Sequence, residues 1–200
     1  DTGATGVIGE RLPHDRITSK LAALSGALGT GTLADAAQAI MTTDTYPKGA
    51  FRVIDIGGTP VTLAGIAKGS GMIAPDMATM LSYVFTDARI GFDALQGMLT
   101  PLNARTFNCI TVDSDTSTSD TLMVCATGAS GADATGHAGF EEALEAVLLD
   151  LAHQVVRDGE GASKFVSITV REAADTADAH KVALAVANSP LVKTAIAGED

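Results

Sequence analysis

The chain has 200 residues, of which 46% are hydrophobic and 18% charged, and its mean hydropathy is +0.25. This is about the length of one domain, and the composition excludes intrinsic disorder and permits a buried core. The net charge of −11 argues against nonspecific binding to nucleic acids or anionic membranes, because both need basic patches.

Hydrophobic periodicity predicts a mixture of helices and strands. In chain order we expect helices over 17–28 and 35–41, strands over 51–56, 60–66 and 79–85, a helix over 92–107, a strand over 122–125, a helix over 140–156, a strand over 165–170, a helix over 174–187 and a short helix that begins at Pro190. Gly57-Gly58 separates the first two strands and predicts a hairpin turn, hence antiparallel pairing. This pattern favours an α+β fold over a doubly wound parallel sheet.

The cysteines and the chain start bear on the cellular context. Cys109 and Cys125 form neither a disulfide framework nor a zinc-ligand pattern, which favours a reducing intracellular compartment. No stretch approaches the roughly 18 apolar residues of a transmembrane helix. The sequence opens with Asp1-Thr2-Gly3 and no initiator Met, which indicates either a removed segment or a piece of a longer protein.

A glycine-rich turn occupies residues 2–9, with the sequence TGATGVIG. It looks like the TGxxGxxG turn with which short-chain dehydrogenases bind the pyrophosphate of NAD. That motif needs a preceding strand and an uninterrupted helix after it, whereas Pro13 and His14 follow here. The sequence also has no Tyr-xxx-Lys pair. A plain glycine turn is therefore the favoured interpretation, and an NAD-binding protein is one alternative.

A second motif, Asp113-Ser114-Asp115-Thr116-Ser117, looks like the DxDxT signature of Mg²⁺-dependent phosphatases. We find no convincing later basic residue or acidic pair to complete that site. The segment also lacks the glycine and terminal Glu of an EF-hand loop. A hydrogen-bonded Asx/ST loop is the favoured interpretation. The four histidines contain no pair at i, i+4, so no HExxH zinc site is predicted.

Residues 68–81 have the sequence KGSGMIAPDMATML. A flexible glycine-rich stretch is followed by a proline and then by an Ala-Thr pair at the start of a predicted strand. Composition alone would make this a loop that enters a strand. Cleavage before Thr79 would change its chemistry, because the new α-amine would have a pKa of about 7.7–8.0 in model peptides. Such an amine can act as the base for the hydroxyl of its own residue, as in N-terminal nucleophiles.

This segment resembles the self-cleavage segment of the bifunctional ornithine acetyltransferase/N-acetylglutamate synthase family of arginine biosynthesis. Five more blocks follow in family order: ATGVIGERLP at 4–13, IMTTDTYPK at 40–48, FNCITVDSDTSTSDT at 107–121, DGEGASKF at 158–165 and ANSPLVKTAIAGED at 187–200. The resemblance implies a layered α/β/β/α-like sandwich of which this chain is a central fragment, cropped at both ends. Residues 1–78 would be the C-terminal part of an α chain, and residues 79–200 the N-terminal part of a β chain. Asp76 departs from the Asn that is common at this place in the family.

The resemblance also implies an activity. The precursor would cut itself between Ala78 and Thr79, and Thr79 would carry the acetyl group from N2-acetylornithine to glutamate, with acetyl-CoA as a second donor in bifunctional members. No other cofactor, metal, nucleic acid or membrane is expected, and the chains would assemble as an α2β2 heterotetramer in the cytoplasm. An N-terminal-nucleophile amidohydrolase that uses water as acceptor is a further alternative. The implied site consists of an oxyanion hole at Thr5 and Gly6, the nucleophile Thr79, and substrate contacts at Thr45, Lys68, Thr79 and Glu160.

Overall fold

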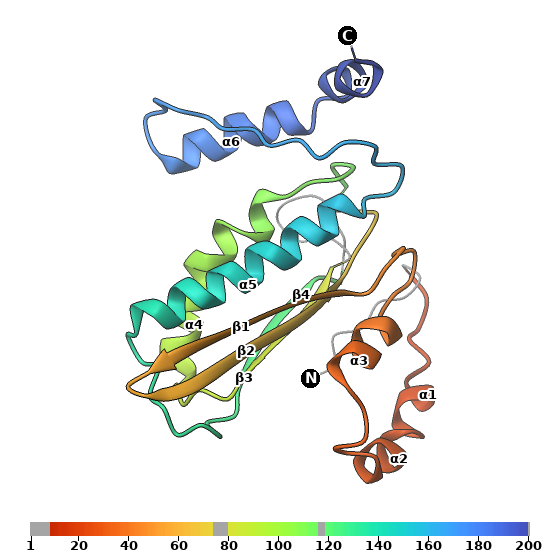
Figure 1. Cartoon of the computed structure of the whole chain (residues 1–200). Helices are drawn as coiled ribbons and strands as arrows, with labels where there is room; N and C mark the ends of the chain where they lie inside the picture. The colour runs from red at the N-terminus through yellow and green to blue at the C-terminus, as the bar shows by residue number, and fades with distance from the viewer. Residues whose placement is uncertain (1–8, 74–79, 116–118, 200) are drawn as a thin grey trace.

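A four-stranded sheet forms the centre of the computed structural model, which describes residues 9–73, 80–115 and 119–199 (Figure 1). Its strands lie in the order β1-β2-β3-β4. Their bounds are β1 Lys48–Ile56, β2 Thr59–Lys68, β3 Leu81–Thr86 and β4 Thr121–Ala126. All four correspond to predicted strands, and the α+β class is confirmed.

The first three strands pair antiparallel, as the hairpin predicted. β1 and β2 pair from Ile56↔Thr59 at the turn to Lys48↔Ala67 at the open end. β4 instead runs parallel to β3, with Leu81 opposite Thr121. The chain between β3 and β4 contains helix α4, Phe92–Ala104, and a crossover of this length lets the second strand run in the direction of the first.

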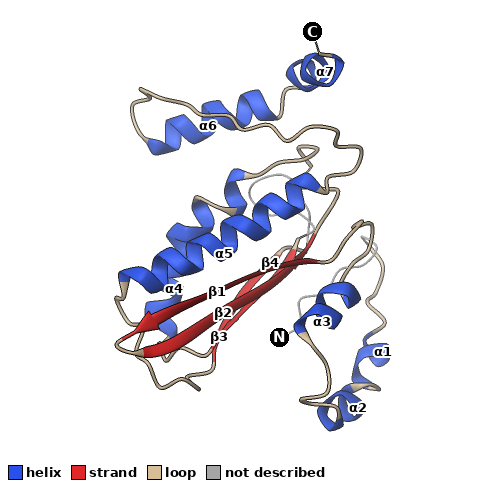
Figure 2. Cartoon of the chain, in the orientation of Figure 1, coloured by secondary structure: helices blue, strands red, loops and turns tan. Residues whose placement is uncertain are grey.

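Two helices cover one face of the sheet, as Figure 2 shows. The longer is α5, Ala138–Arg157, which packs on β1 and β2, while α4 packs beside it. Phe140, Leu144, Val147, Leu148 and Leu151 of α5 are fully buried. Their spacing is that of one helix face, so the predicted amphipathic helix is confirmed together with the surface that it buries.

The opposite face of the sheet carries apolar side chains that remain exposed. Phe51 of β1 and Phe85 of β3 both lie opposite Ala64 of β2, and they are 60% and 40% exposed. Val53 is 52% exposed. Of the expected α/β/β/α layers, the described residues supply one sheet and one helix layer.

Most of the remaining elements lie towards the two ends of the described chain. Two short helices, α1 His14–Thr18 and α2 Leu21–Gly26, replace the single helix predicted over 17–28. Neither has a buried residue, so no packed apolar face holds them together as one helix. The other elements are α3 Leu33–Ala39, a 3₁₀ turn η1 Phe107–Cys109, α6 Thr176–Ala187 and α7 Pro190–Gly198.

The strand predicted over 165–170 is wrong. These residues form no strand and pair with none of the four strands of the sheet. Alternation of apolar and polar residues matches the pleat of a strand, but a strand also needs a neighbour for its backbone hydrogen bonds. Here the segment runs between α5 and α6 as loop.

Candidate active site

Three strand ends meet at one edge of the sheet. Lys68, the last residue of β2, lies opposite Leu81, the first residue of β3, and Leu81 lies opposite Thr121, the first residue of β4. This register places Lys68 beside the strand that follows the predicted cleavage site. Thr5, Gly6, Ala78 and Thr79 lie outside the described residues.

Lys68 is a buried cation, only 3% exposed. Its Nζ donates a hydrogen bond of 2.8 Å to Oγ1 of Thr42, its one hydrogen-bond partner among the described residues. Burial lowers the pKa of Lys68, and the nearby carboxylates Asp44 and Asp120 oppose that shift. A desolvated ammonium group with free donors is suited to a carboxylate ligand, because the Coulomb attraction is less screened there.

A buried ion triad lies next to Lys68. Nζ of Lys48 is 2.7 Å from Oδ1 of Asp44 and 2.5 Å from Oδ2 of Asp158, and the Lys48 side chain is completely buried. Oδ1 of Asp44 also accepts the amide of Gly69 at 2.7 Å. Burial alone would raise the pKa of Asp44, but the hydrogen bonds from Gly69 and Lys48 outweigh it and the pKa is lowered. The pKa of Asp158 is lowered as well, so both carboxylates favour the ionised form, and Asp44 holds the backbone next to Lys68.

Thr45 binds this triad. Its hydroxyl donates to Oδ1 of Asp158, and its amide donates to Oδ2 of Asp158 at 2.9 Å. Because its only hydroxyl proton is used there, Thr45 can serve a ligand only as an acceptor. The hydroxyl in contact with Lys68 belongs to Thr42, which the sequence reasoning missed. Both residues lie in the block IMTTDTYPK, and spacing within the block could not show which one lies beside the lysine.

Glu160 reaches the same region from the end of α5. Its amide donates to the carbonyl of Ser70 at 2.8 Å, and the hydroxyl of Ser70 donates to the carbonyl of Asp158 at 2.7 Å. The exposed carboxylate of Glu160 lies against Gly71, where an added Cβ would stand 2.9 Å from its Cδ. Glu160 therefore lies beside Ser70 and Gly71, and the fold brings it to the short segment that follows Lys68.

The structure supports the Asx-loop interpretation of Asp113. Its Oδ1 accepts the amides of Ile73 at 2.9 Å and of Asp115 at 3.2 Å. Among the residues that the structure describes, no group of three or more His, Cys, Asp or Glu is arranged to hold a metal ion. Cys109 and Cys125 are both free.

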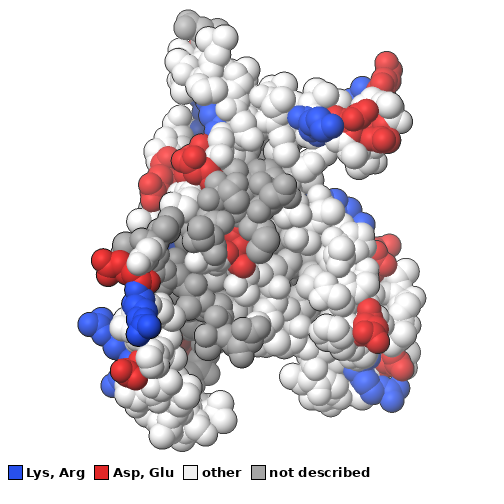
Figure 3. All heavy atoms as spheres, turned by 180° about the vertical axis from the view of Figure 1, so that it is seen from behind, with Lys and Arg blue, Asp and Glu red and all other residues white. Residues whose placement is uncertain are grey.

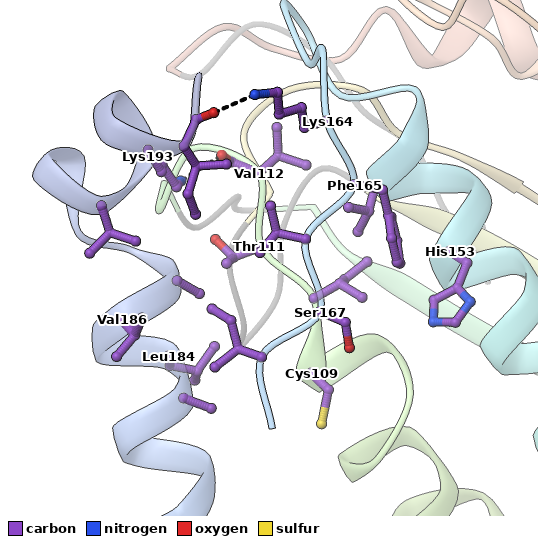
Figure 4. A pocket seen from close by; sticks show the side chains of 18 of the residues that line it. Cys109, Thr111, Val112, His153, Lys164, Phe165, Ser167, Leu184, Val186 and Lys193 are labelled. Carbon is purple, nitrogen blue, oxygen red and sulfur yellow. Dashed lines mark hydrogen bonds between the residues drawn. The ribbon is translucent and has the colours of Figure 1, made fainter. Parts of the chain in front are cut away.

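A cavity of about 680 Å³ lies between α6, α7 and the loop that follows α5 (Figure 4). Of the described site residues, only Glu160 lines it. Lys164 and Lys193 also line it, but Lys164 donates to the carbonyl of Ile196 at 2.6 Å and Lys193 to that of Val112 at 2.7 Å. These two hydrogen bonds hold α7 against the rest of the chain. Because neither Lys68 nor Thr42 lines the cavity, it does not coincide with the region around Lys68.

Charged side chains are scattered over the face drawn in Figure 3. Lys and Arg atoms alternate there with Asp and Glu atoms, mostly near the edges of the described surface. None of the helices in the described parts of the chain combines the length and the apolarity that crossing a bilayer requires.

Taken together, the fold and the site define an α+β protein with a buried cluster of charged residues at the ends of its strands. The family model of the ArgJ family matches residues 2–200, and the chain belongs to this family. This assignment agrees with the ordered blocks of the sequence and gives no support to the NAD-binding alternative.

Curated relatives share the name arginine biosynthesis bifunctional protein ArgJ. The protein from Ruegeria pomeroyi is 67% identical over 199 residues, which are 100% of this chain and 49% of the relative. The protein from Gluconobacter oxydans is 57% identical over 203 residues, covering 98% of this chain and 48% of the relative. The chain thus spans about half the length of the curated relatives it matches.

A solved structure is also similar. It is the crystal structure of the arginine biosynthesis bifunctional protein argJ from Bacillus halodurans, with 45% identity and a TM-score of 0.57. The match covers 59% of this chain and 58% of the other. At this identity the likeness extends beyond the fold to the family.

Proposed function

We propose that this chain is the catalytic middle of an acetyltransferase that moves the acetyl group of N2-acetylornithine to glutamate. The observation that carries the proposal is that Lys68 lies opposite the first residue of β3, while Glu160 contacts the segment that directly follows Lys68. Family membership supports the same activity, since the relatives are named for arginine biosynthesis.

In this proposal the Ala78–Thr79 bond breaks first and Thr79 becomes an N-terminal nucleophile. Its α-amine takes the hydroxyl proton, Oγ attacks the acetyl carbonyl, and the amine of ornithine leaves with a proton. Glutamate then attacks the acetyl-Thr79 ester through its own amine. Thr5 and Gly6 would donate to the oxyanion, where each such donor is worth about 10²–10³-fold in rate.

The charges around β2 suit the two amino-acid substrates. Lys68 would bind a substrate carboxylate, with Thr42 holding its ammonium group in place. Glu160 would pair with a substrate ammonium group, and Thr45 would accept a hydrogen bond from the substrate. Ornithine and glutamate are both α-amino acids, so one pocket can hold them in turn, as a ping-pong reaction requires.

Three further expectations belong to this proposal. Acetyl-CoA would serve as a second acetyl donor, the two processed chains would assemble as an α2β2 heterotetramer, and the enzyme would work in the cytoplasm. Each can be measured separately, by acetyl transfer from acetyl-CoA, by the mass of the assembly in solution and by cell fractionation.

The decisive experiment is intact-mass measurement of the full-length protein with parallel assays of acetyl exchange. We expect a new N-terminus at Thr79, and we expect Thr79→Ala to abolish both cleavage and transfer. An uncut chain that still transfers acetyl groups would overturn the mechanism. Transfer to water in place of glutamate would favour the amidohydrolase alternative, and nicotinamide binding would favour the dehydrogenase alternative.

A further inference from the structure

Two aspartates lie at the ends of the polar segment DSDTSTSD that precedes β4. These are Asp113 and Asp120, and the resemblance to the family assigned neither of them a role in the site. Asp113 accepts hydrogen bonds from backbone amides just before the segment 74–79, and Asp120 accepts one from the amide just after it.

Asp113 holds the chain on the N-terminal side of that segment. Its Oδ2 accepts the amide of Met72 at 2.5 Å, and its Oδ1 accepts the amide of Ile73 at 2.9 Å. The carbonyl of Ile73 in turn accepts the amide of Val112 at 2.7 Å, and the Ile73 side chain is only 1% exposed. Both backbone polar groups of Ile73 are therefore fixed by residues 112 and 113.

Asp120 does the same on the C-terminal side. Its Oδ1 accepts the amide of Met80 at 2.8 Å, and the amide of Thr121 donates to the carbonyl of Met80 at 2.9 Å. Met80 is 8% exposed. Both backbone groups of Met80 are thus fixed by residues 120 and 121.

We propose that Asp113 and Asp120 are positioning residues that hold the two flanks of the bond cleaved during processing. The inference rests on the proposed function, in which that bond joins Ala78 to Thr79. Met80 follows the proposed nucleophile directly in the sequence, and Asp120 and Thr121 fix both of its backbone polar groups. After cleavage, Asp113 would belong to the β chain and Met72 and Ile73 to the α chain, so the same contacts would join the two chains at these residues.

The two carboxylates differ in how many oxygen atoms they use. Asp113 accepts through both oxygens, whereas Asp120 accepts through Oδ1 alone and its buried Oδ2 has no hydrogen-bond partner among the described residues. Asparagine offers only one acceptor oxygen. Asn can therefore replace Asp120 without loss of the contact to Met80, but it cannot replace Asp113 without loss of one amide.

The first experiment compares cleavage rates of the full-length precursor by intact mass over time. We expect Asp113→Asn and Asp120→Ala to slow cleavage by about 10²-fold, the effect of displacing a reacting group by about 1 Å. Asp120→Asn should stay within about threefold of the natural rate, because it conserves the acceptor. Asp115→Asn is the matched control in the same segment, and we expect it to cleave at the natural rate.

The pattern of rates can overturn the proposal. Natural cleavage rates in both Asp113→Asn and Asp120→Ala would do so. An equal loss of cleavage rate in Asp120→Asn and Asp120→Ala would also do so, because it would indicate a role for charge in place of backbone positioning. The kinetics of transfer by processed enzyme add a second readout, since misplacement of the nucleophile lowers kcat with little change in KM.

Hydrogen exchange separates this inference from the proposed function and covers variants that fail to process. The test uses an uncut Thr79→Ala precursor. In it, Asp113→Asn should speed amide hydrogen exchange about tenfold in the peptide that contains Met72 and Ile73. Asp120→Ala should speed amide exchange by a similar factor in the peptide that contains Met80. Uniform exchange changes would overturn the inference, even if Thr79 is the nucleophile. Selective changes in this background, together with a natural Thr79 protein that neither cleaves nor transfers, would overturn the proposed function and leave the two contacts established.

Discussion

Nζ of Lys48 lies 2.5 Å from Oδ2 of Asp158, and this contact ties the first residue of β1 to the residue that caps the C-terminal end of α5. The second carboxylate of the triad, Asp44, holds the amide of Gly69 next to Lys68. One buried ammonium group thus connects the segment that carries Lys68 with the segment that carries Glu160.

We expect Lys48→Met to lower the free energy of unfolding by about 3–5 kcal/mol, because it leaves two buried carboxylates without a cation. Denaturant unfolding monitored by circular dichroism measures the change. Lys181→Met is the matched control, since Lys181 is 84% exposed and 4.0 Å from Asp178. A loss below about 1 kcal/mol for Lys48→Met, similar to an exposed pair, would contradict a structural role for the triad.

Thr42 and Thr45 should differ in how much they contribute to stability. Thr42→Val removes the hydroxyl bound to Lys68, so we expect KM for the amino-acid substrates to rise about tenfold, equivalent to roughly 1.4 kcal/mol, with little change in stability. Thr45→Val removes a donor to Asp158, so we expect a loss of stability of about 1.5 kcal/mol. Steady-state kinetics and thermal unfolding of both variants test this, and an unchanged KM in Thr42→Val would remove Thr42 from the pocket.

Lys68→Ala should act mainly on binding. Removal of the buried ammonium group takes away the proposed partner of the substrate carboxylate, so we expect a raised KM and a smaller change in kcat. Substrate titrations with acetylornithine and glutamate measure both constants. An unchanged KM for both substrates would exclude Lys68 from substrate binding.

Asp120 makes stability depend on pH. Burial raises its pKa from 3.8 to about 6, against the opposing effects of the Met80 amide and of Lys68. The folded chain therefore binds the proton more tightly than the unfolded chain. As a result, the contribution of Asp120 to the free energy of unfolding falls as pH rises from about 3.8 to about 6. Lys68 is the charged group that acts on Asp120, and Asp44 and Lys48 act on Lys68 in turn.

Asp120→Asn should consequently raise the melting temperature at pH 8 and lose this advantage below pH 3.8. Thermal unfolding of the variant and the natural protein across this pH range measures the difference. The control is again Asp115→Asn, whose curve should follow the natural one. A difference that does not change with pH would contradict the titration of Asp120.

The packing of α5 on β2 allows one test of the core. An added Cβ at Gly65 would stand 2.9 Å from Leu151 and 3.0 Å from Val84, so we expect Gly65→Ala to cost about 1–3 kcal/mol of stability. At Gly97, within α4, an added Cβ meets nothing within 4 Å. Gly97→Ala should therefore stabilise the chain by about 0.5–1 kcal/mol, and both changes are measured by denaturant unfolding.

The sequence by itself determined most of the secondary structure and the family. Sequence patterns located the four strands of the sheet and α5, and in α5 the buried residues follow the predicted helical face. Ordered blocks of sequence identified the family, which the family model and the relatives confirm. The failures were residues 17–28 and 165–170, whose patterns lack a buried partner or a neighbouring strand.

Only the tertiary structure decided which polar groups meet. Thr42 rather than Thr45 contacts Lys68, because β2 and the segment before β1 approach in a register that no local pattern encodes. The same is true of Asp113 and Asp120, whose amide partners lie about 40 residues away in sequence. Local spacing predicts which face a residue occupies, whereas long-range hydrogen bonds depend on how separate elements are brought together by the packing of the core.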